Sequence, residues 1–320
     1  MTDRKDDGCL RPRALEWVGR HLDPGEHVVD TGVLYGGLTA EMRWLTVAGP
    51  DGGSRRLVLR TFTHPEFVAD AERLLAGEAA ALAVLTGTGV PAPRPVAVDA
   101  HAAHCEYPSL LMTHLPGRTL LADDGIEERV VPLARQLVAI HRLRPAARPA
   151  GYQPWTTAEE VVPPPGADAA AWSAAVEVIR APAPAYEGRY LHRDFHPCNV
   201  LFEPGPEGAR EPRITGVVDW VQTSWGPADL DVAHCSSNLA MLHGPAWAGR
   251  FAREYERAGG VLAATAGERR YWRLLDALAF SEAATWVVRA WREAGREDLT
   301  VHAVEQRLDA YVTGLMDAAD

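Results

Sequence analysis

Three polar residues near the middle of the chain have the types and the spacing that phosphoryl transfer requires. Asp194 lies in a polar stretch, Asn199 follows it by five positions, and Asp219 ends the apolar run 214–218. The carboxylate of Asp194 can take or orient the proton of an attacking hydroxyl. Asn199 and Asp219 offer hard oxygen ligands to a Mg²⁺ ion carried on nucleotide phosphates. The pattern predicts catalysis by Asp194 and a metal site at the other two residues.

The residues around this set predict a loop followed by a hairpin. Pro197 disfavours helix at this point, because it cannot continue one and restricts the residue before it. Residues 200–202 are apolar, residues 203–208 are rich in Pro and Gly, and residues 214–218 are apolar again. Two strands joined by that turn would bring the two candidate metal ligands near one another. The alternative is an ordinary polar loop with an aspartate that caps a strand end.

A zinc site is another alternative at this loop. His192 and His196 are four positions apart and Cys198 is close to them, so on a helix the two histidines would face one way. Pro197 interrupts such a helix, and the neighbouring carboxylate and amide suit magnesium better than zinc. We therefore expect His192 to support the loop by hydrogen-bonding to the backbone.

The order of these residues resembles two groups of kinases. The His-Arg-Asp triplet that ends at Asp194, with Asn199 five positions on, resembles the catalytic loop of protein kinases. The chain departs from that pattern, because His-Pro follows the aspartate closely and Asp219 begins an Asp-Trp pair in place of Asp-Phe-Gly. In this form it resembles the aminoglycoside phosphotransferase family of small-molecule kinases. The resemblance extends over about residues 20–300 and is most specific within 191–233.

This resemblance implies an α+β, bilobal fold like that of protein kinases. A small N-terminal lobe with a sheet, residues 1–113, would cover the nucleotide. A larger and mainly helical C-terminal lobe, residues 114–320, would carry the catalytic loop and bind the acceptor. The implied cofactors are ATP or GTP and Mg²⁺.

The resemblance also implies which residues hold the nucleotide phosphates. Gly36 and Gly37 lie between two predicted strands, where the family covers the phosphates. Arg60 ends a strand at the position of the kinase lysine, and Glu78 in the following helix is its implied ion-pair partner. Arginine is a departure from lysine, but a guanidinium also binds phosphate. Glu72 stays an alternative partner, because it lies near the start of the same helix.

Thr113 and Leu115 are the implied contacts of the nucleotide base. The stretch 109–113 predicts a buried strand that runs into a Leu-Pro-Gly turn. At this hinge the family hydrogen-bonds adenine through backbone groups. Backbone contacts need no particular side chain, so this assignment rests on the resemblance alone.

The rest of the chain predicts helices. Apolar residues recur at helical spacing through 126–141, where Pro132 indicates that the regular helix starts near it. A second helix is expected over 169–179, with Asp168 placed to cap it. Asp229, at the start of a later apolar stretch, would cap a helix or hold the catalytic loop through backbone N–H groups.

The composition is that of a globular protein in a reducing compartment. The 320 residues are 47% hydrophobic and 23% charged, which allows one large or two moderate domains with a proper core. A net charge of −11 argues against a protein that binds nucleic acid. The four cysteines form no CxxC pair, and the sequence shows no apolar leader and no run long enough to span a membrane. We expect a cytoplasmic monomer or dimer that binds neither nucleic acid nor membrane.

These features predict a kinase that moves the γ-phosphoryl group of a nucleotide to a hydroxyl of a small molecule, such as an aminoglycoside antibiotic. A metabolite kinase of the same fold, of the choline, homoserine or sugar type, fits the motif as well. A non-catalytic pseudokinase is disfavoured because Asp194, Asn199 and Asp219 are all present. A protein kinase is disfavoured because the Asp-Phe-Gly and Ala-Pro-Glu signatures are missing.

The acidic balance of the chain further suggests a cationic acceptor held by carboxylates of the second half. The carboxylates expected to be available for this are Asp231, Glu254, Glu256, Asp276 and Glu282.

Overall fold

The chain folds into two compact units. The computed structural model describes residues 3–4, 10–34, 40–206 and 210–318. The first unit contains Met1–Arg118 together with the distant segment Thr215–Gln222. The second contains Thr119–Ile214 and Thr223–Asp320. The segment that carries Asp219 therefore belongs to the same unit as the N-terminal part of the chain.

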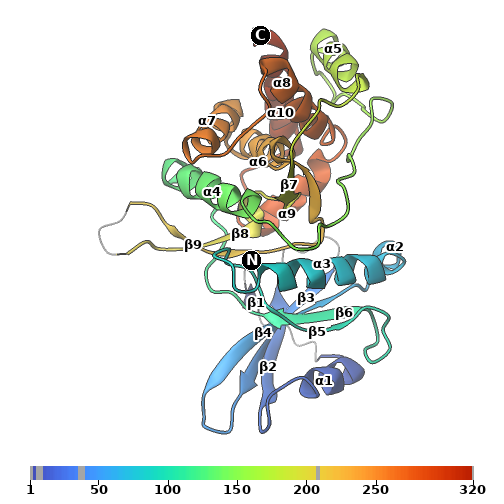
Figure 1. Ribbon diagram of the computed structural model, residues 1–320, viewed down its shortest axis with the longest axis vertical. Helices are drawn as coiled ribbons and strands as arrows, with labels where there is room; N and C mark the ends of the chain where they lie inside the picture. The colour runs from blue at the N-terminus through green and yellow to red at the C-terminus, as the bar shows by residue number, and fades with distance from the viewer. Residues whose placement is uncertain (1–2, 5–9, 35–39, 207–209, 319–320) are drawn as a thin grey trace. The chain divides into compact units, whose positions relative to one another are not determined.

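Within the described residues, the first unit is built on a six-stranded antiparallel sheet (Figure 1). Its strands, in their order across the sheet, are β1 (Asp3–Arg4), β2 (His27–Leu34), β3 (Glu41–Ala48), β4 (Ser54–Thr61), β6 (Ser109–Thr113) and β5 (Pro95–Asp99). Its helices are α1 (Pro12–Gly19), α2 (Pro65–Val68) and α3 (Ala71–Leu85). The turn between β3 and β4 is closed by Asp51, whose Oδ1 accepts the N–H of Gly53 at 3.0 Å.

Helix α3 and strand β4 each bury one charged residue. The buried residues of α3 include Leu74, Leu75, Glu78 and Leu82, whose spacing places Glu78 on the apolar face of the helix. This helix lies beside β5 and β6 in the first unit (Figure 1). Arg60 lies near the end of β4 and is also buried. Buried charges need partners, and these two are close enough to supply them to each other.

The segment Thr215–Gln222 is fixed to the first unit by two hydrogen bonds to other residues of that unit. The N–H of Val217 donates to the backbone oxygen of Pro91 at 2.7 Å, and the hydroxyl of Thr215 donates to the backbone oxygen of Pro116 at 2.6 Å. Trp220 is fully buried, and its Nε1 donates to the backbone oxygen of Val217 at 2.8 Å. These contacts hold the residue between them, Asp219, in place.

The second unit is mainly helical. Its helices are α4 (Ile126–His141), α5 (Ala169–Arg180), α6 (Ala228–His243), α7 (Pro245–Arg257), α8 (Ala266–Leu278), α9 (Ala284–Glu293) and α10 (Val301–Asp317). Its strands β7 (Gly188–Leu191) and β10 (Ser224–Pro227) pair antiparallel. The 3-10 turn η1 (Pro197–Asn199) leads into β8 (Val200–Glu203), which pairs with β9 (Arg213–Val217).

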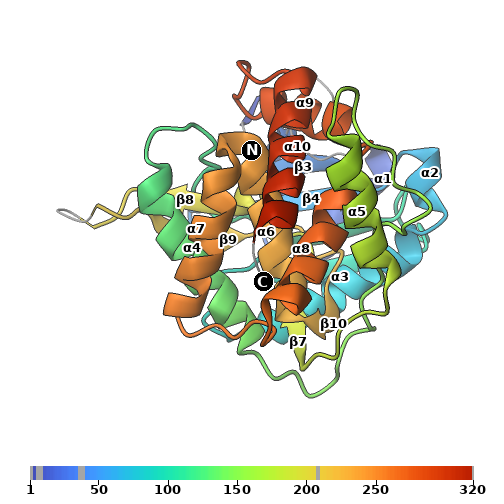
Figure 2. The same ribbon diagram turned by 90° about the horizontal axis from the view of Figure 1, so that it is seen from above.

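Helix α6 is the core of the second unit. All residues from Ala228 to Leu242 are buried, so that the helix has no solvent-facing side. Helices α7, α8 and α10 pack against it, and Figure 2 shows it in the middle of the helical unit. Polar side chains on such a helix must find partners inside the protein. The charged residues of α6 therefore hold other segments in place.

Three sequence-based expectations for the fold are confirmed and one is wrong. The bilobal α+β class is confirmed, as is the hairpin after the catalytic loop. Asp168 caps α5 by accepting the N–H groups of Ala170 and Ala171 at 3.0 Å each. The expectation that Pro132 lies in the first turn of its helix is wrong, because α4 starts at Ile126 and Pro132 lies inside it. None of the helices in the described part of the chain is long and apolar enough to cross a membrane.

Candidate active site

A buried carboxylate of α6 fixes the backbone of the loop that carries Asp194. Asp231 is fully buried and accepts hydrogen bonds from the backbone N–H groups of His192, at 2.9 Å, and Arg193, at 2.7 Å. The ring Nε2 of His141, on α4, lies 3.1 Å from the same carboxylate. Arg193 has a φ of +75°, a left-handed conformation that a non-glycine residue keeps only where its surroundings enforce it. Asp231 thus supplies the acceptors for two backbone N–H groups of the sharp turn before Asp194.

This arrangement corrects two expectations for the start of α6. Holding the catalytic loop was one of the roles expected of Asp229, but both of its carboxylate oxygens lie 3.1 Å from the N–H of Ala263. Asp231 holds the loop instead. Residues two apart on a helix face different directions, so the two carboxylates serve different partners. Asp231 is also not available to a cationic acceptor, because it is buried and its oxygens are already occupied.

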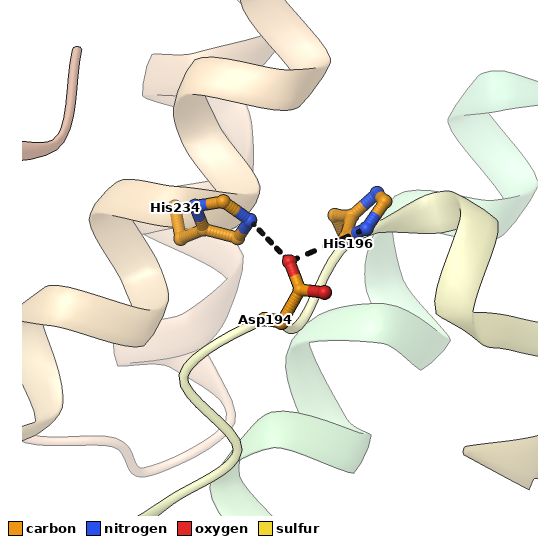
Figure 3. A group of neighbouring side chains, drawn as sticks. All are labelled: Asp194, His196 and His234. Atoms are coloured by element: carbon orange, nitrogen blue, oxygen red, sulfur yellow. Dashed lines mark hydrogen bonds and ion pairs between the residues drawn. The ribbon is translucent and has the colours of Figure 1, made fainter. Parts of the chain in front are cut away.

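Both oxygens of Asp194 are held by nitrogen atoms of the second unit, and Figure 3 shows the two histidines at one of these oxygens. Oδ1 lies 3.0 Å from Nε2 of His234 and 3.5 Å from Nε2 of His196, and Oδ2 accepts the amide of Asn199 at 3.0 Å. The side chain is 29% exposed, so a substrate can reach it. Burial alone would raise the pKa of Asp194, but the nearby His196 and the hydrogen bond from His234 outweigh it and hold the pKa well below its usual range. Asp194 is therefore an ionised carboxylate whose plane is fixed.

Asn199 directs its amide nitrogen at Asp194. The nitrogen donates to the backbone oxygen of Asp194 at 2.9 Å as well as to its carboxylate, and lies 3.1 Å from Nε2 of His196. No described residue donates a hydrogen bond to the amide oxygen of Asn199. That oxygen is a hard ligand of the kind that a divalent cation such as Mg²⁺ prefers.

His234, on α6, belongs to the site although the catalytic motif does not include it. It is buried, and its Nδ1 lies 3.0 Å from Oδ1 of Asp276 on α8. Burial would lower the pKa of His234, but Asp276 and Asp194 outweigh it and raise the pKa to about 9. One signal was available in the sequence, because His234 follows Asp231 by three positions and so lies on the same side of the helix. Asp276, expected to face an acceptor, is instead buried against His234.

The disfavoured zinc set is not formed. His192 is fully buried and its Nδ1 lies 3.3 Å from the N–H of Asp194, while Cys198 packs against the apolar core. The described residues instead bring together Asp194, His196 and His234, whose potential ligand atoms all lie within 4.8 Å of one another (Figure 3). Both ring nitrogens of His234 already have a carboxylate oxygen at 3.0 Å, so neither is directed at an open position for a metal ion.

Arg60 lies between two carboxylates in the first unit. Its Nη1 is 3.0 Å from Oε2 of Glu78 and 3.0 Å from Oδ1 of Asp219, so the ion pair that the resemblance implied with Glu78 is present. The alternative partner Glu72 is exposed and lies 3.3 Å from His101 instead. Burial opposes the charge of Arg60, but the two carboxylates outweigh it and keep its pKa above the usual range. For Glu78, burial is the larger influence and raises the pKa to about 7.

Asp219 keeps one oxygen for a further partner. Its φ of +67° is left-handed, and its side chain is 33% exposed. Arg60 takes Oδ1, and no described residue donates to Oδ2. Because Asp219 belongs to the first unit and Asn199 to the second, a metal ion shared between them stays a prediction.

The remaining candidate nucleotide contacts are two glycines and the two hinge residues, and the hinge residues differ in their hydrogen bonds. Gly36 and Gly37 lie outside the described residues. Thr113 is engaged with Arg94, because its N–H donates to the backbone oxygen of Arg94 and its hydroxyl accepts the N–H of Arg94, both at 2.9 Å. Leu115 is half-buried, and its backbone N–H and carbonyl have no hydrogen-bond partner in the described part of the chain. Of the two hinge candidates, Leu115 is therefore the one whose backbone groups have no partner among the described residues.

A match between the sequence and a family model identifies the family of this chain. Residues 36–272 match the phosphotransferase enzyme family, APH. The chain belongs to this family. The resemblance to the aminoglycoside phosphotransferases is thereby confirmed. A search of curated protein sequences gave no match.

Solved structures of phosphotransferases have the same fold. The chain is 20% identical to a macrolide 2'-phosphotransferase type I, covers 96% of both chains and superposes with a TM-score of 0.57. It is 23% identical to an aminoglycoside-3'-phosphotransferase of type VIII, with 82% of this chain and 97% of that chain covered and a TM-score of 0.53. It is 18% identical to a thermostable mutant of aminoglycoside phosphotransferase APH(4)-Ia in a ternary complex with ADP and hygromycin B, with 92% and 96% covered and a TM-score of 0.58.

Two of the other carboxylates expected to attract a cationic acceptor to this phosphotransferase are paired with arginines. Glu254 is buried and lies 2.9 Å from Arg250 and 2.6 Å from Arg257. Glu256 lies 3.2 Å from Arg269. Asp231 and Asp276 are buried as well, so three of the five candidates lie inside the protein, while Glu256 and Glu282 are exposed. Burial therefore withdraws three of the five carboxylates from an acceptor, and a cationic acceptor stays a prediction.

Replacing Asp231 by Ala should destabilise the second unit and abolish turnover. The change removes the acceptor of two buried backbone N–H groups, so we expect D231A to lose roughly 3–5 kcal/mol of the free energy of unfolding. D231N should lose less, because its amide oxygen still accepts one of the two. Urea unfolding followed by circular dichroism measures both, with D229A as the control that loses one backbone partner. A D231A protein that unfolds at the wild-type urea concentration would show that the loop is held by other contacts.

The buried pair of Arg60 and Glu78 can be tested by a double-mutant cycle. R60M leaves Glu78 buried without a cation, so we expect it to cost roughly 3–5 kcal/mol of the free energy of unfolding. The double variant R60M/E78Q should recover part of that loss, because the charge that remains without Arg60, that of Asp219, is partly exposed to water. The single variant E78Q completes the cycle, and if the losses of R60M and E78Q simply add in the double variant, the two side chains are not energetically coupled.

Proposed function

We propose that this phosphotransferase moves the γ-phosphoryl group of ATP or GTP to a hydroxyl of a small molecule. The observation that carries the proposal is the fixed carboxylate of Asp194, whose two oxygens are held by His234 and Asn199 while the side chain stays partly exposed. A carboxylate in this state can accept the hydrogen bond of an acceptor hydroxyl and orient its oxygen for attack.

Asn199 and Asp219 are the proposed ligands of a Mg²⁺ ion. Each has one oxygen that no described residue occupies, and both oxygens are of the hard type that magnesium takes. When bound, the ion would neutralise charge on the nucleotide phosphates. The buried Arg60, oriented by Glu78, is the proposed contact of the phosphates, and the backbone groups of Leu115 are the proposed contact of the base.

The acceptor class is proposed from chemistry and from the relatives. A carboxylate base and an intact set of catalytic residues suit a hydroxylated small molecule. The related structures named for macrolide and aminoglycoside phosphotransfer, and the complex with ADP and hygromycin B, support an antibiotic as the first acceptor to test. Metabolite alcohols of the choline, homoserine and sugar types form the second group of compounds.

The experiment measures nucleotide consumption with ATP and with GTP across both groups of compounds, and product mass for the addition of one phosphate. D194A should lower kcat about 10²–10⁴-fold on the best acceptor and leave nucleotide affinity within a few-fold of wild type. D51A, in the exposed turn between β3 and β4, is the matched control and should keep full activity. Near-normal turnover by D194A would remove Asp194 from the chemistry.

The metal assignment has its own test. D219N replaces a charged oxygen ligand by a neutral amide, so the Mg²⁺ concentration that gives half-maximal rate should rise steeply. Titration of Mg²⁺ against the initial rate measures this. An unchanged Mg²⁺ dependence in D219N would contradict a metal site at this residue.

A further inference from the structure

His234 connects the candidate base to a second buried acid, and nothing in the phosphotransfer motif accounts for it. Its ring has Oδ1 of Asp194 at 3.0 Å from Nε2 and Oδ1 of Asp276 at 3.0 Å from Nδ1. Deepening the proposed function, on which this inference rests, we propose that His234 is a positioning residue for phosphoryl transfer. It is a buried imidazolium that holds the Asp194 carboxylate in its reactive orientation and is itself anchored by Asp276.

The charge of His234 follows from its partners. A neutral imidazole carries one N–H, so it can donate to one carboxylate oxygen and turns a lone pair toward the other. Two carboxylate oxygens at 3.0 Å, one on each ring nitrogen, are both satisfied when the ring carries two protons. The carboxylate of Asp276 is buried, and an unpaired buried carboxylate is costly. An imidazolium supplies the counter-charge, and the raised pKa of His234 agrees with this.

The surroundings of the ring fix its orientation. Phe280 stacks on it with ring centroids 5.6 Å apart and planes 22° apart, and Trp155 meets it edge-on with centroids 4.9 Å apart. The amide of Asn238 donates to the backbone oxygen of His234 at 2.9 Å and lies 3.2 Å from Nε2. His196 lies on the remaining side, with its ring centroid 5.6 Å away. A ring held in this way cannot turn away from Asp194 without disrupting its neighbours.

A fixed donor at Oδ1 determines which lone pairs of Asp194 a substrate can use. His234 holds Oδ1 and Asn199 holds Oδ2, so the carboxylate cannot rotate about its own axis. The acceptor hydroxyl then hydrogen-bonds to the lone pair that these donors leave. Because the transition state of phosphoryl transfer is loose, orientation of the attacking oxygen counts for more than the strength of the base.

The proton balance of the step is compatible with a permanent imidazolium. The acceptor oxygen bonds to the γ-phosphorus as the bond to the β–γ bridging oxygen breaks, and the nucleoside diphosphate leaves. The hydroxyl proton passes to Asp194, and His234 keeps both of its protons throughout. The positive charge of His234 favours the carboxylate form of Asp194, so the proton moves late, after the acceptor oxygen has begun to bond to phosphorus.

Two isosteric substitutions separate this role from a purely structural one. The amide nitrogen of Gln takes the place of Nε2, so H234Q keeps the donor to Asp194 and loses the contact with Asp276. The amide nitrogen of Asn takes the place of Nδ1, so H234N keeps the contact with Asp276 and loses the donor to Asp194. H234F keeps the aromatic volume and loses both.

We expect kcat to fall about tenfold in H234Q, which keeps the hydrogen bond and loses the charge, and about 100-fold in H234N and H234F. The KM for the nucleotide should stay within about threefold of wild type in all three. The free energy of unfolding should follow a different order, with H234N more stable than H234F, because H234N still pairs the buried Asp276. If kcat instead follows stability across the set, or if H234N keeps the kcat of H234Q, the role is structural and the inference is overturned.

Two controls complete the experiment. His243 is a second buried histidine of α6 and contacts Asp123 at 2.6 Å outside the site, so H243Q should keep the wild-type kcat. D276N loosens the anchor without touching Asp194, so it should lower kcat at unchanged nucleotide KM even if an H234 variant fails to fold. An unchanged kcat in D276N and H234N beside an inactive D194A would overturn the role of His234 alone. An active D194A would overturn the proposed function itself.

Discussion

A single buried carboxylate on α6 fixes the backbone around which the candidate active site is assembled. Asp231 accepts two consecutive N–H groups, of His192 and Arg193, and this holds Arg193 in a left-handed conformation. A carboxylate that is fully desolvated gains little from water and much from donors at 2.7–2.9 Å. The position of the loop is therefore set by α6, the most buried helix in its unit. The loop in turn sets the positions of the residues that follow, Asp194 and Asn199.

The same physical solution appears once in each unit. In the second unit, the buried Asp276 anchors His234, which holds the partly exposed Asp194. In the first unit, the buried Glu78 anchors Arg60, which holds the partly exposed Asp219. In both cases a cation lies between two acids, one with a side chain 1% exposed and one about a third exposed, at 29% or 33%. The inner acid makes burial of the cation tolerable, and the cation orients the outer acid.

This arrangement suits chemistry that depends on positioning. A carboxylate at the protein surface is solvated and mobile, whereas one tied to a buried cation is oriented before a substrate arrives. The cost is the burial of several charges, which is tolerated only because each has a partner within hydrogen-bond distance. The family match makes the chain a phosphotransferase, and the paired charges show how its polar groups are held in place.

The sequence by itself determined the local features. The Asp194–Asn199 spacing, the proline that excludes a helix, the hairpin that follows, the Asp168 cap and the partner of Arg60 in the next helix all depend on nearby residues or on the family resemblance. The tertiary structure decided what depends on packing between distant segments. Packing placed residues 215–222 with the N-terminal unit. It also made Asp231, and not Asp229, the residue that holds the catalytic loop, and it brought His234 on α6 into contact with Asp276 on α8. It also buried three of the five expected acceptor carboxylates beside partners of their own, since a charge count records how many acids a chain has and burial decides which of them remain available.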